Sequence, residues 1–149
     1  MLYKQQSFSN FEPDLRYLDS FPFSREEFLF FDIETTGFSP RNTSLYLIGA
    51  VCFLDEHWTF LQWFAETPSE ECEILNAFLA FCRSFRAVVH FNGDGFDIPY
   101  LLFKAEKYTL SDTLSSMQSI DLYRLTRPYK KISETDAHQP EKSGIFPWH

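Results

Sequence analysis

The chain has 149 residues, of which 44% are hydrophobic and 19% aromatic, and its net charge at pH 7 is −8. This length suits a single domain, and the apolar content is sufficient for a packed core, which excludes a globally disordered chain. The negative charge excludes a broadly basic surface that would bind nucleic acid, but it leaves a local contact assisted by cations open. The cysteines show no Cys-x-x-Cys spacing, which argues against a zinc site and a disulfide framework.

No targeting or membrane-spanning segment is recognisable. The first residues are polar and lack the apolar stretch of a signal peptide, and the longest apolar run, Leu45 to Leu54, is too short to cross a bilayer as a helix. Free thiols are typical of a reducing compartment. We therefore expect a cytoplasmic protein that does not contact a membrane.

The first half of the chain reads as strands. Residues 1–26 carry scattered aromatic residues without a clear period, and we expect them to form an N-terminal lead-in that packs against the domain. Apolar runs predict strands at 27–33, 45–54 and 58–65. The glycine, proline and asparagine residues of 36–43 predict a turn after the first strand.

The second half alternates helices and short strands. Apolar spacing predicts helices at 67–85 and 99–107, and short apolar runs predict strands at 86–91 and 119–123. The order β-β-β-α-β-α-β predicts an α/β fold with a mixed sheet, in which an antiparallel meander is followed by α-β-α-β.

Two carboxylates end the first predicted strand, within Phe30-Phe31-Asp32-Ile33-Glu34-Thr35-Thr36-Gly37. Because alternate side chains of a strand share a face, Asp32 and Glu34 point to the same side. A hard divalent cation such as Mg²⁺ resolves the repulsion between two such acids. From this spacing alone, a metal site and a strand end that merely meets solvent both remain open.

A third acid follows the predicted strand at 86–91, within Asn92-Gly93-Asp94-Gly95-Phe96-Asp97. A turn explains the glycines, and Asp97 close to a proline also suits a helix cap. In open α/β sheets, however, ligands gather where loops leave the carboxyl ends of strands. Asp97 is therefore also placed to meet Asp32 and Glu34 across adjacent strands.

Together, Asp-Ile-Glu-Thr-Thr-Gly after one strand and Asn-Gly-x-x-Phe-Asp after a later one resemble the DEDD (DnaQ-like) 3′–5′ exonuclease superfamily. More closely, the chain resembles the YprB-type ribonuclease H-like domain of that superfamily, over residues 27–130. The resemblance implies a ribonuclease H-like exonuclease domain at 27–131, followed by an irregular tail at 132–149. It also implies metal-dependent 3′–5′ exonuclease hydrolysis of phosphodiester bonds in nucleic acid.

The resemblance also implies a role for each acid. Asp32, Glu34 and Asp97 are the expected catalytic residues and metal ligands. In this family they would hold two Mg²⁺ or Mn²⁺ ions, which activate the attacking water and stabilise charge on the phosphate oxygens.

The expected partner is a DNA or RNA 3′ end. The resemblance implies that Thr35, Thr36 and Gly37 bring the backbone close to the terminal nucleotide. Asn92 is expected to position either the second motif or the substrate. Asp121 matches an aspartate that usually lies outside the metal site.

The third motif of the family, a late helix with a fourth acid and a Tyr or His base, is not recognisable. Asp136 and His138 occur in reversed order, in a segment without helical period. We therefore expect a domain without its C-terminal helices, with apolar surface exposed on one sheet face, and a truncated or frame-shifted gene product from Ile132 onward. Two alternatives stay open: a non-catalytic ribonuclease H-like remnant that binds nucleic acid or a protein partner, and a structural domain whose acids are incidental.

Overall fold

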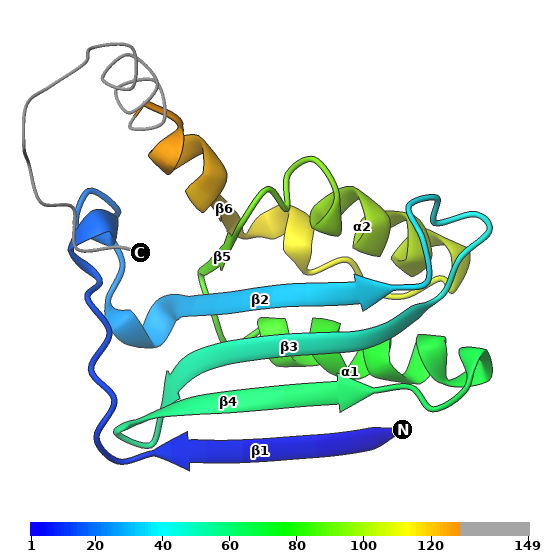
Figure 1. Ribbon diagram of the computed structural model, residues 1–149, viewed down its shortest axis with the longest axis horizontal. Coiled ribbons are helices and arrows are strands. Elements are labelled where there is room, and N and C mark those ends of the chain that lie inside the picture. The colour runs from blue at the N-terminus through cyan, green and yellow to red at the C-terminus, as the bar shows by residue number, and fades with distance from the viewer. Residues whose placement is uncertain (129–149) are drawn as a thin grey trace, which may run out of the picture.

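The computed structural model describes residues 1–128 of the chain. Six strands form one sheet, in the order β1-β4-β3-β2-β5-β6 (Figure 1). The strands are Leu2–Phe8 (β1), Phe28–Thr35 (β2), Leu45–Leu54 (β3), His57–Phe64 (β4), Ala87–His90 (β5) and Gln118–Asp121 (β6). The α-helices are Glu71–Cys82 (α1) and Asp97–Lys107 (α2), and short 3₁₀ helices span Arg16–Leu18, Arg25–Glu27, Pro68–Glu70 and Leu114–Ser116. Residues 122–128 are helical as well.

The sheet is mixed, which confirms the predicted α/β fold. β2, β3 and β4 pair in antiparallel fashion, whereas β5 is parallel to β2 and β6 is parallel to β5. The parallel strands follow helices because a parallel connection needs a crossover. Within residues 1–128, no helix has the length and apolar composition that crossing a membrane requires.

The sequence analysis did not predict β1. This strand pairs with β4 in antiparallel fashion along its whole length, from Leu2 opposite Phe64 to Phe8 opposite Trp58. All of its residues are exposed, so no alternation of buried and exposed positions marks it in the sequence. The N-terminal lead-in therefore packs against the domain partly as an edge strand. Its boundary at residue 26 stays a prediction, and the tail at 132–149 lies outside the described residues.

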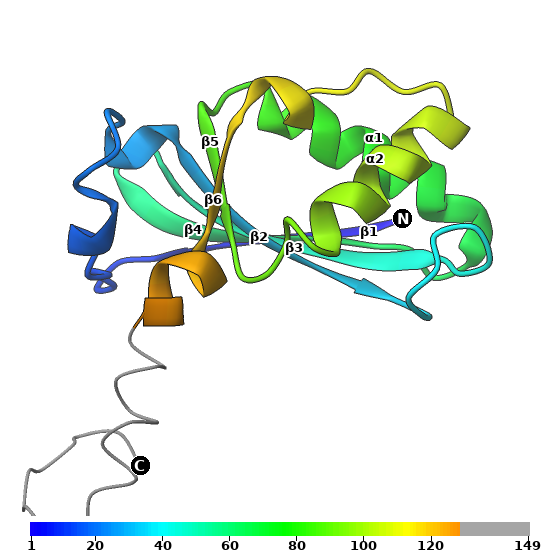
Figure 2. The same cartoon turned by 90° about the horizontal axis from the view of Figure 1, so that it is seen from above.

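Both α-helices pack on one face of the sheet (Figure 2). The core on this face is aromatic: the ring of Phe78 in α1 lies 5.4 Å from the ring of Phe31 and 5.6 Å from that of Trp63, centroid to centroid. Phe78 is completely buried. Burying a side chain of this size contributes about 1.5–3 kcal/mol, so this layer holds α1 against the strands.

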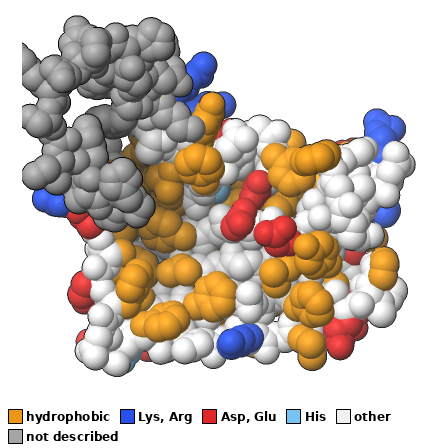
Figure 3. All heavy atoms as spheres, viewed as in Figure 1, with side chains coloured by type: hydrophobic (Ala, Val, Ile, Leu, Met, Phe, Trp, Pro, Cys, Tyr) orange, Lys and Arg blue, Asp and Glu red, His pale blue; other side chains and the backbone are white. Residues whose placement is uncertain are grey.

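The opposite face of the sheet, called the open face below, is only partly covered by residues 1–128. Leu18 packs against Phe28 and Val89 at one end of it. Elsewhere on this face a cavity of about 590 Å³ is bordered by Phe30, Leu47 and other strand residues. Figure 3 shows hydrophobic side chains gathered on this face, with acidic side chains near its middle. The sequence analysis expected apolar surface on one sheet face, and neither α1 nor α2 covers this face.

Replacing Phe78 with alanine tests this description of the core. Because the ring packs against Phe31 and Trp63, Phe78→Ala should lower the free energy of unfolding by about 3–5 kcal/mol. The matched control is Phe38→Ala, the same change at a side chain that is 90% exposed. It should alter stability by less than about 1 kcal/mol. Urea denaturation followed by tryptophan fluorescence measures both, and equal effects would contradict the assigned core.

Candidate metal and active site

Asp32 and Glu34 project from β2 onto the open face. Their neighbours Phe31 and Ile33 are buried on the helix-covered face, whereas both acids are exposed, as the alternation of the strand predicts. Asp32 and Glu34 both line the cavity together with Phe30. The two carboxylates therefore stand in an open, partly apolar hollow.

Asp97 is the first residue of α2 and is buried. Its Oδ2 atom is buried and has no hydrogen-bond partner among residues 1–128. Burial, and after it the negative charge of Asp32, raise the pKa of Asp97 to about 7. The carboxyl groups of Asp32 and Asp97 are close enough to hydrogen-bond if one of them keeps a proton. At neutral pH this pair needs either a shared proton or a cation.

The contact between Asp32 and Asp97 fits a divalent cation. Carboxylate oxygens are the ligands that Mg²⁺ and Mn²⁺ prefer, and the free Oδ2 of Asp97 is available as a ligand. Glu34 lines the same cavity as Asp32. Among the described residues, the three acids do not form a compact metal-binding cluster. The structure thus brings Asp32 and Asp97 together, and a shared site with Glu34 stays a prediction.

The hydroxyl groups of Thr35 and Thr36 are bonded within the loop between β2 and β3. Thr35 Oγ1 donates to the carbonyl oxygen of Gly37 at 2.7 Å, and the Ser44 amide donates to Thr36 Oγ1 at 2.9 Å. A Cβ atom on Gly37 would lie 2.7 Å from Cγ2 of Thr43, so this close approach requires glycine. The Thr36 hydroxyl accepts this bond and keeps a proton that it can donate, whereas the Thr36 amide donates to the Ser44 carbonyl oxygen at 2.9 Å. Contact between this loop and a nucleotide stays a prediction.

Asn92 shapes the turn that leads to Asp97. Its φ angle of 58° lies in the left-handed region, which asparagine tolerates better than most residues. The Asn92 amide donates to Oδ1 of Asp121 at 2.7 Å, and the Gly93 amide donates to Nδ1 of His90 at 2.9 Å. Asn92 therefore positions the turn through its backbone, and contact with a substrate stays a prediction.

His90, Asp94 and Asp121 form a compact cluster whose ligand atoms lie within 4.8 Å of one another. Burial lowers the pKa of His90, so its imidazole is neutral at pH 7. Since Nδ1 accepts a hydrogen bond, Nε2 carries the proton and donates to Ser119 Oγ at 2.7 Å, and Ser119 donates in turn to Asp94 Oδ1 at 2.7 Å. Asp94 also pairs with Arg124 at 3.4 Å. These groups satisfy one another, so the cluster fastens the turn between β5 and α2.

The sequence analysis missed a buried network around Glu71 and Lys104, which are 2% and 1% exposed. Lys104 donates to Glu71 Oε1 at 2.9 Å, and the Tyr108 hydroxyl donates to the same atom at 2.6 Å. One signal was present: Tyr100, Lys104 and Tyr108 follow Asp97 at spacings of three and four residues, which places them on one side of a helix. A search for apolar periodicity alone overlooks such a polar stripe.

The fold and the Asp32–Asp97 contact define a ribonuclease H-like α/β domain with a candidate cation site. The family model of the RNase H superfamily matches residues 29–142. The chain belongs to this superfamily. No curated protein sequence matches the chain.

Two solved structures share the fold. The family B DNA polymerase from the hyperthermophilic archaeon Pyrobaculum calidifontis superposes with a TM-score of 0.57, at 20% identity over 68% of this chain. E. coli exonuclease I in complex with a dA16 oligonucleotide superposes with a TM-score of 0.52, at 17% identity over 77% of this chain. The chain spans 16% and 32% of the lengths of these two proteins. The ribonuclease H-like fold expected from the motifs is confirmed.

Replacing Asp97 with asparagine should stabilise the protein in the absence of metal. The folded state keeps the Asp97 proton up to about pH 7, whereas an unfolded aspartate releases it near its ordinary value of 3.8. Between these values the folded state binds more protons, so the stability contributed by this group is lost as the pH rises. At pH 8 with EDTA, Asp97→Asn should therefore exceed the wild type in unfolding free energy, by up to about 4 kcal/mol.

At pH 5 the two proteins should differ much less, because Asp97 is then protonated in the folded wild type. Urea denaturation at both pH values measures the effect. A wild type that becomes more stable than Asp97→Asn as the pH rises would contradict the described environment of Asp97.

Proposed function

We propose that this chain is a divalent-metal-dependent 3′–5′ exonuclease-type domain that hydrolyses phosphodiester bonds at DNA or RNA ends. The observation that carries the proposal is the contact between Asp32 and Asp97, in which one buried carboxylate oxygen has no partner among residues 1–128. A cation between these acids removes their repulsion and supplies the chemistry that nucleases use. Fold neighbours that are a DNA polymerase and an exonuclease bound to an oligonucleotide support nucleic acid as the substrate class.

Each of the three acids has a proposed role that follows from its position. Asp32 and Asp97 would hold Mg²⁺ or Mn²⁺, and Glu34 would add a carboxylate from the open face. A divalent ion bound there stabilises negative charge on phosphate oxygens and lowers the pKa of a coordinated water. Asp97 lies at the start of a helix that is packed against the sheet, so its carboxylate is fixed before a substrate arrives.

The loop after Glu34 supports a nucleotide-binding role. In our proposal the backbone of Thr36 and Gly37 approaches the terminal nucleotide, and the Thr36 hydroxyl, which accepts the Ser44 amide, donates its own proton to that nucleotide. Phe38 is 90% exposed, and its ring meets the Phe96 ring edge to face at 6.1 Å. An exposed aromatic ring beside an acidic site offers a stacking surface for a base, which is worth about 1–3 kcal/mol.

We place this activity in the cytoplasm. Cys52 and Cys82 are free and buried, and burial raises the pKa of both thiols to about 12. Such thiols stay protonated at neutral pH, and cysteines that are free are typical of a reducing compartment.

Activity assays with matched Asp→Asn variants test the proposal. The wild type should release mononucleotides from the 3′ end of a 5′-labelled single-stranded DNA or RNA with Mg²⁺ or Mn²⁺, and EDTA should stop the reaction. Asp32→Asn should reduce the rate by about 100-fold or more, because a ligand charge is lost. The control is Asp121→Asn, since an asparagine oxygen can keep the bonds from the Asn92 and Tyr123 amides. It should stay within about threefold of the wild type.

Other outcomes favour other functions. A wild type that releases no nucleotide, yet binds the oligonucleotide equally well with EDTA and after Asp32→Asn or Asp97→Asn, would support a non-catalytic remnant. Loss of activity with Asp121→Asn but not with Asp32→Asn would move the metal site to the His90, Asp94 and Asp121 cluster.

A further inference from the structure

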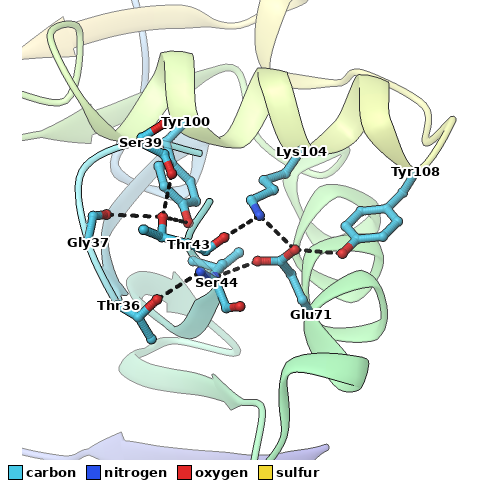
Figure 4. A network of polar contacts seen from close by, with 10 residues as sticks. Thr36, Gly37, Ser39, Thr43, Ser44, Glu71, Tyr100, Lys104 and Tyr108 are labelled. Atoms are coloured by element: carbon cyan, nitrogen blue, oxygen red, sulfur yellow. Dashed lines mark hydrogen bonds and ion pairs between the residues drawn. The ribbon is translucent and has the colours of Figure 1, made fainter. Parts of the chain in front are cut away.

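A buried ionic network joins both helices to the loop between β2 and β3 (Figure 4). Glu71, the first residue of α1, and Lys104 of α2 form a salt bridge of 2.9 Å, with both side chains almost completely buried. Lys104 Nζ also donates to the carbonyl oxygen of Thr43 at 2.6 Å. Glu71 Oε2 accepts the amide of Leu45 at 2.5 Å. The pair therefore holds the backbone where the loop enters β3.

The network continues from Thr43 through the loop. Thr43 Oγ1 lies 2.7 Å from the carbonyl oxygen of Ser39 and 3.3 Å from that of Gly37. The same hydroxyl lies 2.9 Å from the hydroxyl of Tyr100 on α2. A chain of polar contacts thus runs from Lys104 to Gly37, one of the residues proposed to approach the substrate.

One side of α2 carries both Asp97, a proposed metal ligand, and residues of this network. Asp97, Tyr100, Lys104 and Tyr108 are spaced by three, four and four residues, so they share a helix face. The helix is a rigid element, and a contact near its middle fixes the orientation of the acid at its start. Through α2, the position of the loop is therefore linked to the position of the Asp97 carboxylate.

Stability alone does not explain a buried ion pair. Removing two charges from water is costly, and a well-packed apolar pair is often as stable or more stable. Apolar side chains would fill the space between α1 and α2, but they could not bond the Thr43 carbonyl and the Leu45 amide. Glu71 and Lys104 therefore contribute something that an apolar pair would not: they bond the loop backbone and so determine its geometry.

We propose that Glu71 and Lys104 are positioning residues, which hold the loop backbone at Thr36 and Gly37 in fixed register with the Asp32–Asp97 pair so that a nucleic-acid terminus is correctly placed. The identity of this ligand rests on the proposed function. The positioning of the loop by the ion pair does not depend on it.

The double variant Glu71→Gln/Lys104→Met tests the proposal, because it removes both charges together and leaves no unpaired buried charge. It should keep the circular dichroism spectrum of the wild type and bind Mn²⁺ within about threefold of the wild-type affinity. Hydrogen exchange at the Thr36, Ser44 and Leu45 amides should accelerate by about tenfold or more. For release of the terminal nucleotide, kcat should fall by about 10- to 100-fold with little change in KM, because the terminus is bound but misplaced.

The matched control is Asp14→Asn/Arg16→Gln, which removes an exposed ion pair of the same charges, 2.6 Å apart. It should leave hydrogen exchange in the loop and kcat unchanged. A folded double variant with wild-type exchange at these amides, or with wild-type kcat, would overturn the proposal.

Failure of the proposed function is distinguishable from failure of this inference. A wild type without nuclease activity refutes the function, while hydrogen exchange still decides whether the ion pair positions the loop. If the double variant does not fold, the single variant Glu71→Gln replaces it, since glutamine keeps an acceptor for Lys104. Faster exchange at Leu45 in that variant supports the proposal, and unchanged exchange overturns it.

Discussion

The contact between the carboxyl groups of Asp32 and Asp97 is the constraint on which the site depends. Asp32 stands on the open face of the sheet, and Asp97 is buried at the start of α2, where one of its oxygens lacks a partner in the described part of the chain. Burial, and after it the negative charge of Asp32, raise the pKa of Asp97 to about 7, so the two acids do not both ionise at neutral pH unless a positive charge lies nearby. In the proposed function, a cation between the two acids would supply this positive charge.

Two hydrogen-bond networks, one centred on a neutral histidine and the other on an ion pair, flank the contact between Asp32 and Asp97. On one side, neutral His90 donates to Ser119, which donates to Asp94, and this chain fastens the turn that leads into Asp97. On the other side, the Glu71–Lys104 pair fastens the loop that follows Glu34. The acids thus lie between two turns that are each held by side-chain hydrogen bonds. The proposed reaction would need such preorganised acids.

Much of the fold followed from local patterns. The apolar run at Leu45–Leu54 marks β3 with the bounds seen in the structure. The common face of Asp32 and Glu34 follows from the two-residue period of a strand. The meeting of Asp32 with Asp97 follows from the parallel pairing of β2 with β5, because the turn that leaves β5 lies beside β2. β1 was missed because it is exposed on both faces and carries no burial pattern.

The parts of the site that escaped prediction depend on tertiary contacts between charged groups. Sequence patterns place lysine and glutamate at the surface, where they usually lie, and only the packing of α1 against α2 shows that Glu71 and Lys104 are buried as a pair. The bond between His90 and Ser119 likewise exists only because β5 pairs with β6. The burial of Asp97, which decides its ionisation, could not be read from a turn followed by a proline.

Anomalous diffraction from crystals of the wild-type protein soaked in Mn²⁺ at pH 8 tests the central claim most directly. The account predicts an anomalous peak bounded by the carboxylates of Asp32 and Asp97, which disappears in crystals of Asp97→Asn. A peak located only at His90, Asp94 and Asp121, or no peak at the acid pair in well-diffracting crystals, would contradict it.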